Sequence, residues 1–287
     1  MAKLGVITDG ISRDLEQALA VINETGLACA ELQYVWDGEV GDLSDAQLDR
    51  AQRLVTAHRV EVSCISRHIF GGLALGELET DSPAYLEELA ALRRCIDMAD
   101  ALDCRLARIM SFRKEMILFE GQGAEQWVVS RGAWDKLKAM LLPALEIAAE
   151  RGVRLVVETG NNAMINSAWL ARKLNDELSS EQLKTLWDPA NSLYCAESPF
   201  PAGYEALRGV LGHIHIKDVL VDMPRARVDC VPLGSGQMAP FLEQMAAALA
   251  ADGYAGSVSL ESVYRPPGGS FADGFRASID KFKAVFG

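Results

Sequence analysis

The sequence lacks any apolar run approaching the roughly 18 residues of a membrane-spanning helix, and its N-terminal apolar stretch is far too short for a signal peptide. It also lacks an excess of positive charge, since the net charge is −12 and the isoelectric point is near 4.9. Proteins that bind nucleic acids normally carry a basic patch or domain. We therefore expect a cytoplasmic protein that binds neither nucleic acid nor membrane.

No C-x-x-C pair occurs, so neither a zinc ribbon nor a dithiol redox motif is indicated. The cysteines are scattered along the chain, and in a cytoplasmic protein thiols stay reduced. We expect all of them to be free and buried like small apolar residues. They are Cys29, Cys64, Cys95, Cys104, Cys195 and Cys230.

The chain also lacks a Pro/Gly/Ser-rich linker or a block of charge that would mark a domain boundary. Its 287 residues, 49% of them hydrophobic, suffice for one large core, so we expect a single domain over residues 1–287. Eight β-rich runs alternate with helical stretches, a pattern typical of an α/β protein of the (β/α)₈ TIM barrel type, with a doubly wound sheet as the alternative. The runs are 4–8, 28–32, 60–65, 105–110, 154–157, 184–187, 211–219 and 257–260.

Helix starts are marked by residues that favour N-terminal caps. Ser12 is the expected N-cap of a helix that ends near Thr25, and Ser44 is the expected cap of the next one. Ser82 and Pro83 fit the N-cap and first position of a long third helix. Residues 221–236 are expected to form a loop.

The seventh run holds two of the four histidines of the chain. Strand alternation places His213, His215 and Lys217 on one side, and Ile214 and Ile216 on the other. Such a strand can present imidazoles to a pocket while its apolar side packs in a core. The run therefore predicts a metal or catalytic site.

Three further runs end in an acid: Glu158 after the fifth, Asp188 after the sixth and Glu261 after the eighth. Any one of them could be a helix cap or loop residue. Functional side chains of a barrel gather at the carboxyl ends of its strands, and these acids and His215 occupy four successive ends. Three carboxylates and one imidazole suit Mn²⁺, Mg²⁺ or Co²⁺, and a cation would relieve their mutual repulsion.

Other polar residues are weaker candidates. His68, Asn191 and Lys217 are expected to contact substrate. His213 lies one layer deeper than His215 and is expected to support the barrel or the metal ligands. His58, near a helix end, is expected to be structural.

At these residues the chain resembles the xylose-isomerase-like barrel superfamily, which includes sugar and sugar-phosphate isomerases, epimerases and inosose dehydratases. The resemblance implies that Glu158, Asp188, His215 and Glu261 bind one divalent ion, Mn²⁺ before Mg²⁺, Co²⁺ or Zn²⁺. It also implies that Glu158 and Glu261 act as acid/base groups. The matching stretches are Val-Val-Glu158-Thr-Gly-Asn161, Trp187-Asp188-Pro-Ala-Asn191, His213-Ile-His215-Ile-Lys217-Asp218, Pro232-Leu-Gly-Ser-Gly236 and Ser259-Leu260-Glu261-Ser262.

Two positions depart from the ketose epimerases of that superfamily. Asn191 stands where those enzymes carry a histidine, and Val221 stands where they carry an arginine. Arg225 or Arg227, from the same loop, is the expected substitute for the arginine. Because both departures touch substrate contacts, no particular sugar is predicted.

We expect an isomerase or epimerase of a small ketose or related polyhydroxy carbonyl compound, which removes a proton next to a metal-polarised carbonyl to give an enediolate. Loss of a β-hydroxyl from the same enediolate would make it a dehydratase or β-eliminating lyase. A non-catalytic metal- or ligand-binding subunit is the alternative of another class. An abasic-site endonuclease is disfavoured, because its metal cluster needs more than four histidines. The expected partner is a small carbohydrate, and a homo-oligomer is compatible with these observations.

Overall fold

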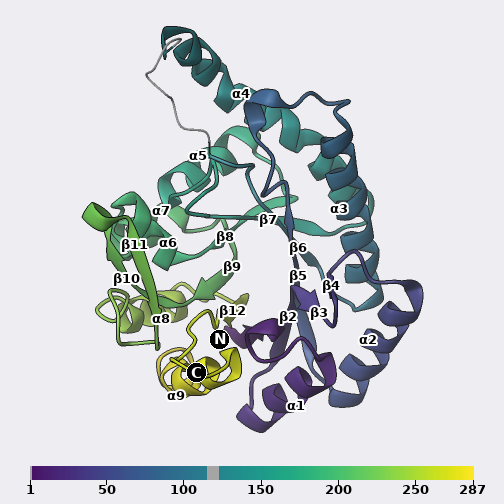
Figure 1. Ribbon diagram of the computed structural model, residues 1–287, viewed down its shortest axis with the longest axis vertical. Helices are drawn as coiled ribbons and strands as arrows, with labels where there is room; N and C mark the ends of the chain where they lie inside the picture. Colours follow the sequence, from purple (N-terminus) through teal and green to yellow (C-terminus); the bar gives the residue numbers. More distant parts are fainter. Residues whose placement is uncertain (1, 115–122) are drawn as a thin grey trace.

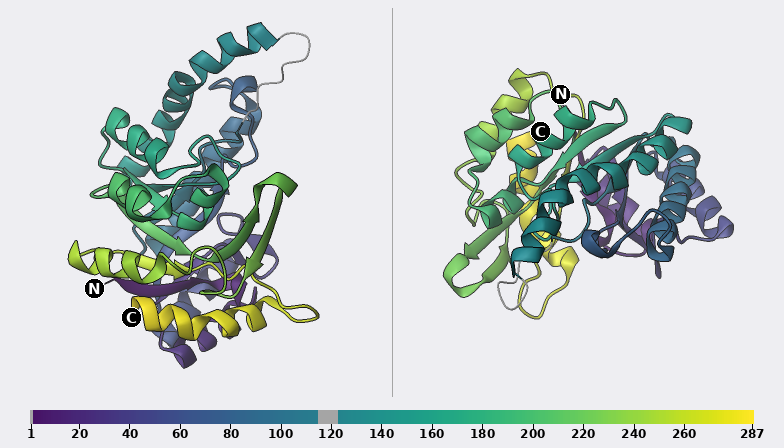
Figure 2. Two further views of the ribbon diagram at one scale, coloured as in Figure 1. Left: turned by 90° about the vertical axis from the view of Figure 1, so that its left-hand side faces the viewer. Right: turned by 90° about the horizontal axis from the view of Figure 1, so that it is seen from above.

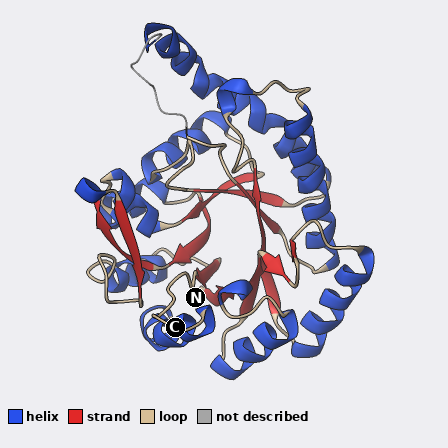
Figure 3. Cartoon of the chain, in the orientation of Figure 1, coloured by secondary structure: helices blue, strands red, loops and turns tan. Residues whose placement is uncertain are grey.

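Eight parallel strands close into a barrel that helices surround, as the computed structural model of residues 2–114 and 123–287 shows (Figures 1 and 3). Each strand is hydrogen-bonded to the next around the ring, and the first strand closes against the last. The ring order is β1 (Lys3–Ile7), β12 (Ser257–Leu260), β9 (Leu211–Ile216), β8 (Leu183–Trp187), β7 (Arg154–Glu158), β6 (Leu106–Ile109), β5 (Glu61–Ile69) and β2 (Cys29–Leu32).

The helices follow the strands along the chain and cover the outside of the barrel (Figure 3). The α-helices are α1 (Leu15–Thr25), α2 (Asp45–His58), α3 (Pro83–Ala101), α4 (Gly123–Glu150), α5 (Ala168–Leu178), α6 (Pro189–Ser192), α7 (Tyr204–Leu207), α8 (Leu242–Ala251) and α9 (Phe271–Phe286). Two antiparallel hairpins lie outside the ring, namely β3 (Tyr34–Val35) with β4 (Gly38–Glu39), and β10 (Asp218–Asp222) with β11 (Arg227–Val231).

The predicted (β/α)₈ barrel is confirmed, and the doubly wound alternative is wrong because the sheet closes. The seventh run is shorter than predicted: β9 ends at Ile216, and Asp218 and Val219 begin the β10–β11 hairpin. The predicted loop over 221–236 therefore contains one arm of a hairpin, which projects away from the barrel in Figure 2. Apolar residues resume directly after Asp218, at Val219, Leu220 and Val221, so the sequence does not mark this break.

One predicted helix cap is wrong. Asp14, not Ser12, caps α1, because its carboxylate accepts a hydrogen bond from the backbone N–H of Gln17. The Ser12 hydroxyl accepts from the N–H of Asp14 instead. The predicted starts at Ser44 and at Ser82 with Pro83 are confirmed.

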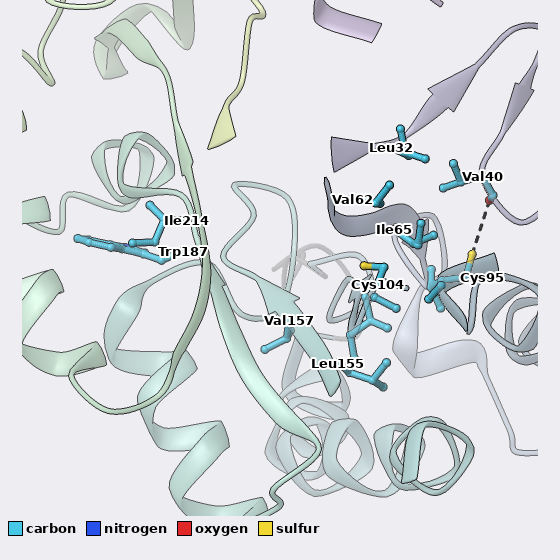
Figure 4. Close-up of a cluster of buried hydrophobic side chains, with 14 of the residues drawn as sticks. Leu32, Val40, Val62, Ile65, Cys95, Cys104, Leu155, Val157, Trp187 and Ile214 are labelled. Carbon is cyan, nitrogen blue, oxygen red and sulfur yellow. Dashed lines mark hydrogen bonds between the residues drawn. The ribbon is translucent and has the colours of Figure 1, made fainter. Parts of the chain in front are cut away.

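The main hydrophobic core lies between the barrel wall and the helices. Strand alternation sends Val157, Trp187 and Ile214 outward into this layer, where they are fully buried (Figure 4). Burial of an aliphatic side chain of this size contributes about 1.5–3 kcal/mol, so this layer dominates the stability of the fold. The wall is thereby fixed, and the residues facing inward are free to be polar.

A small apolar cluster of Cys64, Val156 and Leu186 is separate from the main core and forms the floor of the barrel interior. Glu158 lies two residues after Val156, and Asp188 lies two residues after Leu186. By strand alternation both acids face inward as well. The apolar floor thus lies one pleat below the acids and helps keep water from reaching them from beneath.

No helix in the described part of the chain combines the length and the apolar character needed to cross a bilayer. All six cysteines are free, with four buried and Cys195 and Cys230 half-buried, so the prediction of free thiols is confirmed.

Burial should make these thiols slow to alkylate. It raises the pKa of Cys95 and of Cys104 to about 12, because a thiolate is poorly solvated in apolar surroundings. At pH 8 we expect iodoacetamide to modify Cys195 and Cys230 first in the folded protein, and all six thiols after denaturation without reductant. Mass spectrometry reads out both states, and a disulfide in the denatured sample would contradict the prediction.

Candidate metal and active site

The four predicted ligands lie at the carboxyl ends of four neighbouring strands. Glu158 is the last residue of β7, Asp188 follows β8, His215 lies in β9 and Glu261 follows β12. These strands are consecutive in the ring, so their inward-facing side chains converge. All four residues are strongly shielded from solvent, with the Asp188 and His215 side chains fully buried.

His215 is the centre of this group. Its Nδ1 atom lies 3.7 Å from Glu158 Oε1 and 3.9 Å from Glu261 Oε2. Its Nε2 atom lies 2.8 Å from Glu31 Oε1. Because a carboxylate only accepts hydrogen bonds, Nε2 donates to Glu31, which leaves Nδ1 facing the two glutamates. Such a carboxylate–imidazole pair is the usual way to orient a metal-binding histidine.

Asp188 is held from one side and faces a cation on the other. As N-cap of α6, its Oδ1 accepts hydrogen bonds from the backbone N–H groups of Ala190 and Asn191. Its Oδ2 lies 2.5 Å from Lys217 Nζ, which also donates to Glu261 Oε2 at 2.8 Å. The ammonium therefore lies between two of the predicted ligand carboxylates.

Electrostatics explains why the Lys217 ammonium lies between the carboxylates of Asp188 and Glu261. Burial raises the pKa of Asp188; the Lys217 ammonium acts in the opposite direction, and the Glu261 charge adds to the rise. Burial alone would lower the pKa of Lys217, but the charges of Asp188 and Glu261 raise it well above its ordinary value. A cluster of buried carboxylates thus requires positive charge within it.

Arg108 fixes Glu158. Its guanidinium donates to Glu158 Oε2 at 3.0 Å, to the carbonyl oxygen of Ser66 at 2.6 Å and to Gln33 Oε1 at 3.3 Å. Burial would raise the pKa of the Glu158 carboxyl, but the Arg108 charge and His215 outweigh it and lower that pKa. Glu158 is therefore an anion whose Oε2 is occupied by arginine and whose Oε1 faces His215.

Glu31 and Arg108 were not predicted from the sequence. Glu31 lies in β2, is fully buried, and accepts hydrogen bonds from His213 Nε2 at 2.7 Å, from His215 and from the Ser66 hydroxyl. The only sequence signal was a charged residue inside a short apolar run, at a position that alternation turns inward. His213, which was expected to support the barrel or the metal ligands, pairs with Glu31.

Glu31 and His215 titrate as partners. Burial would raise the pKa of Glu31, but the charges of His215 and His213 and their hydrogen bonds lower it well below its ordinary value. Burial would lower the pKa of His215, but the Glu31 charge and the contact with Glu158 raise it to about 10. Removing Glu31 would thus leave buried imidazoles without a counter-charge.

We expect Glu31→Ala to lower the free energy of unfolding by about 3–5 kcal/mol, as removal of one partner of a buried ion pair does. Urea denaturation measures this change. Glu61→Ala is the control: it removes an exposed partner of Lys3 and should cost less than about 1 kcal/mol. Similar midpoints for the two variants would contradict a structural role for Glu31.

The donor set fits a divalent cation. His215 Nδ1 is buried, has no hydrogen-bond partner in the described structure, and faces two carboxylate oxygens. Oxygen donors with one imidazole are the set preferred by Mn²⁺ and similar ions. Glu31, His213 and His215 form a second, overlapping group that could hold a metal ion, with ligand atoms all within 4.8 Å of one another.

The predicted substrate contacts have different surroundings. Lys217 is in the site, and Asn191 is buried beside it, where its amide donates to the carbonyl oxygen of Thr159. His68 lies near the end of β5, and its Nδ1 lies 3.0 Å from Glu39 Oε1. Arg225 and Arg227 are exposed on the β10–β11 hairpin and pair with acids of that hairpin.

Solved structures with the same fold include enzymes that act on sugars. The 3-keto-D-glucoside 4-epimerase YcjR from E. coli has a TM-score of 0.75 and 18% identity over 99% of both chains. The D-allulose 3-epimerase from Methylomonas sp., solved with D-allulose, has a TM-score of 0.71 and 16% identity over 99% of this chain and 97% of that one. The probable 3-DHS dehydratase AsbF from Bacillus anthracis has a TM-score of 0.75 and 15% identity over 98% of both.

At these identities the likeness concerns the fold. No curated protein matches the sequence. The family model described as xylose isomerase-like TIM barrel matches residues 19–285. Since that match spans nearly the whole chain, the protein belongs to the xylose isomerase-like TIM barrel family.

Proposed function

We propose that the protein is a divalent-metal-dependent isomerase or epimerase of a small ketose or related polyhydroxy carbonyl compound. The observation that carries the proposal is the convergence of Glu158 and Glu261 on the unpaired Nδ1 of His215, with Asp188 joined to Glu261 through Lys217. The sugar epimerases among the structural neighbours support the substrate class.

Glu158, Asp188, His215 and Glu261 would hold the ion, and Mn²⁺ suits them best, with Mg²⁺, Co²⁺ and Zn²⁺ as alternatives. Once bound, a divalent ion polarises a carbonyl, acidifies the neighbouring C–H group and stabilises an enediolate. Lys217 would have to withdraw from between Asp188 and Glu261, which its flexible four-carbon stem allows.

The two glutamates have unequal surroundings, which suggests unequal roles. Arg108 holds Glu158 in place and keeps it anionic, so Glu158 would mainly fix charge and geometry. Glu261 is bound by the mobile side chain of Lys217 and is 19% exposed, so it can reach a substrate in the barrel mouth. Glu261 would remove the proton, and its return by the same carboxyl group to the neighbouring carbon gives isomerisation. Epimerisation requires a proton from a second donor on the opposite face, and the Lys217 ammonium is the donor available in the site.

Solvent exchange tests the proposal. The Mn²⁺-loaded protein is incubated in D₂O with a panel of free ketoses, and deuterium at carbon is followed by NMR. We expect incorporation next to the carbonyl of at least one ketose, with loss of exchange after metal removal. Metal and sugar binding without exchange from any of them would favour the non-catalytic binding subunit.

A lyase is the second candidate, favoured by the ammonium of Lys217 beside Glu261 and by the dehydratase among the structural neighbours. Lys217 could donate a proton to a departing β-hydroxyl, so that water leaves as the enediolate collapses. The same NMR experiment distinguishes this outcome, because a dehydrated product loses the signals of two carbinol carbons, the one that gave up its proton and the one that gave up its hydroxyl.

A further inference from the structure

A hollow of about 350 Å³ lies at the carboxyl ends of the strands, and its lining includes Gly160, two residues after Glu158. Tyr34 follows β2, His68 lies near the end of β5, Met110 follows β6, and Asn161 follows Glu158 by three residues. Its volume is within the range of about 300–1,000 Å³ for small-molecule sites. A second hollow, lined by Glu261, measures only about 110 Å³.

The larger hollow has rigid polar groups. Glu39 Oε1 accepts from both the backbone N–H and Nδ1–H of His68, so this carboxylate fixes the imidazole tautomer. The Nε2 atom of His68 is thereby left with a lone pair for a ligand hydroxyl. The His68 side chain is 43% exposed, so a ligand in the hollow can reach it.

The hollow also has an apolar floor, and the glycines beside it leave room that larger residues would fill. Met110 forms this floor between two glycines, and a Cβ atom on Gly160 would approach Met110 Cε to 3.0 Å. Tyr34 adds aromatic surface, and the fully buried Phe112 supports the wall from behind. Flat apolar walls combined with a few fixed hydrogen-bonding groups match the two kinds of surface on a sugar ring.

The charges of the residues that line the hollow indicate whether the ring it binds is charged or uncharged. The described residues that line the hollow include one carboxylate, Glu39, but neither arginine nor lysine. Arg67 pairs with Glu39 and with Asp42 and is not part of the lining. Phosphate binding calls for arginine, lysine or clustered backbone N–H donors, so the hollow suits an uncharged ligand.

We propose that this hollow binds a second, uncharged sugar ring, so that the substrate is a glycoside whose first ring reacts at the acids. This inference rests on the proposed function and names its substrate class. Binding of the second ring should tighten affinity, because the ring gains a hydrogen bond to His68 and apolar contact with Tyr34 and Met110.

Isothermal titration calorimetry with the Mn²⁺-loaded protein tests it, using maltose, cellobiose, lactose and sucrose, each against the methyl glycosides of its rings. We expect at least one disaccharide to bind about tenfold or more tightly than its methyl glycoside. Asn161→Trp, which fills the hollow from its rim, and His68→Ala should reduce that preference to less than about threefold. His58→Ala, at the end of α2, should leave it unchanged.

The proposal is overturned if no disaccharide is preferred, or if the preference survives Asn161→Trp. It is also overturned if glucose 6-phosphate binds tenfold more tightly than glucose and loses this advantage in that variant. Deuterium exchange from free ketoses without a disaccharide preference would overturn the second-ring site alone. A disaccharide preference without exchange from any ketose, free or glycosidic, would contradict only the proposed function.

Discussion

Asp188→Ala should lose the bound divalent ion, whereas His213→Gln should keep it. Two overlapping groups share His215: the proposed ligand set with Glu158, Asp188 and Glu261, and the buried group with Glu31 and His213. His213 Nδ1 is also buried without a hydrogen-bond partner in the described structure, so burial does not tell which of the two groups binds the ion. Replacing one residue that belongs to only one group, Asp188 or His213, does tell them apart.

The expected effects differ greatly. Loss of a direct ligand should weaken metal binding by at least about 100-fold, the upper end of what mutation of an outer hydrogen-bond partner costs. A glutamine at 213 can still donate to Glu31 through its amide, so His215 stays oriented and affinity should change by less than about tenfold. Metal content after dialysis, measured by mass spectrometry, gives the result.

Asp188→Asn is the matched variant, because an asparagine retains an oxygen for the N–H groups of Ala190 and Asn191. It should preserve the start of α6 and still bind metal poorly. Circular dichroism controls for folding. Full metal content in both Asp188 variants, with loss in His213→Gln, would indicate that the ion binds at the group of Glu31, His213 and His215.

The sequence pattern predicted the residues whose positions follow from local rules. Each of Glu158, Asp188 and Glu261 comes directly at a strand end, and the barrel topology alone brings such positions together. His215 was found because alternation in one strand separates imidazoles from isoleucines.

Glu31 and Arg108 could not be predicted from the sequence, because their partners lie across the barrel. Glu31 is 184 residues from His215 in sequence, and β1 and β12 separate their strands in the ring. Contacts through the interior depend on side-chain length and barrel diameter, which no local pattern records. The His68–Glu39 pair is similar, because Glu39 reaches the mouth only through the β3–β4 hairpin.

Glu261→Gln should lower kcat by at least about 100-fold while the protein keeps its metal. A glutamine has nearly the same shape. Lys217, which donates to Glu261 Oε2, would withdraw when metal binds, so the amide oxygen is free to turn toward the ion. Only the ability to take up a proton is lost, and a general base typically contributes about 10²–10⁴-fold. Steady-state kinetics on whichever ketose shows solvent exchange measures the effect.

The surroundings of Glu158 predict a different result for Glu158→Gln. Arg108 carries only donors, so the amide oxygen must face it and the NH₂ group must turn toward His215 Nδ1. That variant should lose metal affinity as well as turnover. Glu243→Gln is the matched control, since Glu243 also pairs with a lysine, Lys281, but on the outside of the barrel. Glu243→Gln should leave metal affinity and turnover unchanged.

Metal content and kinetics together separate the roles of the two glutamates. Reduced kcat with full metal content in Glu261→Gln, beside reduced metal content in Glu158→Gln, would identify Glu261 as the base and Glu158 as an arginine-fixed ligand. Near-normal turnover by metal-loaded Glu261→Gln would remove Glu261 from proton transfer. Lys217, whose Nζ lies 2.8 Å from Glu261 Oε2, would then be the next candidate for proton transfer, and Lys217→Met the next variant to measure.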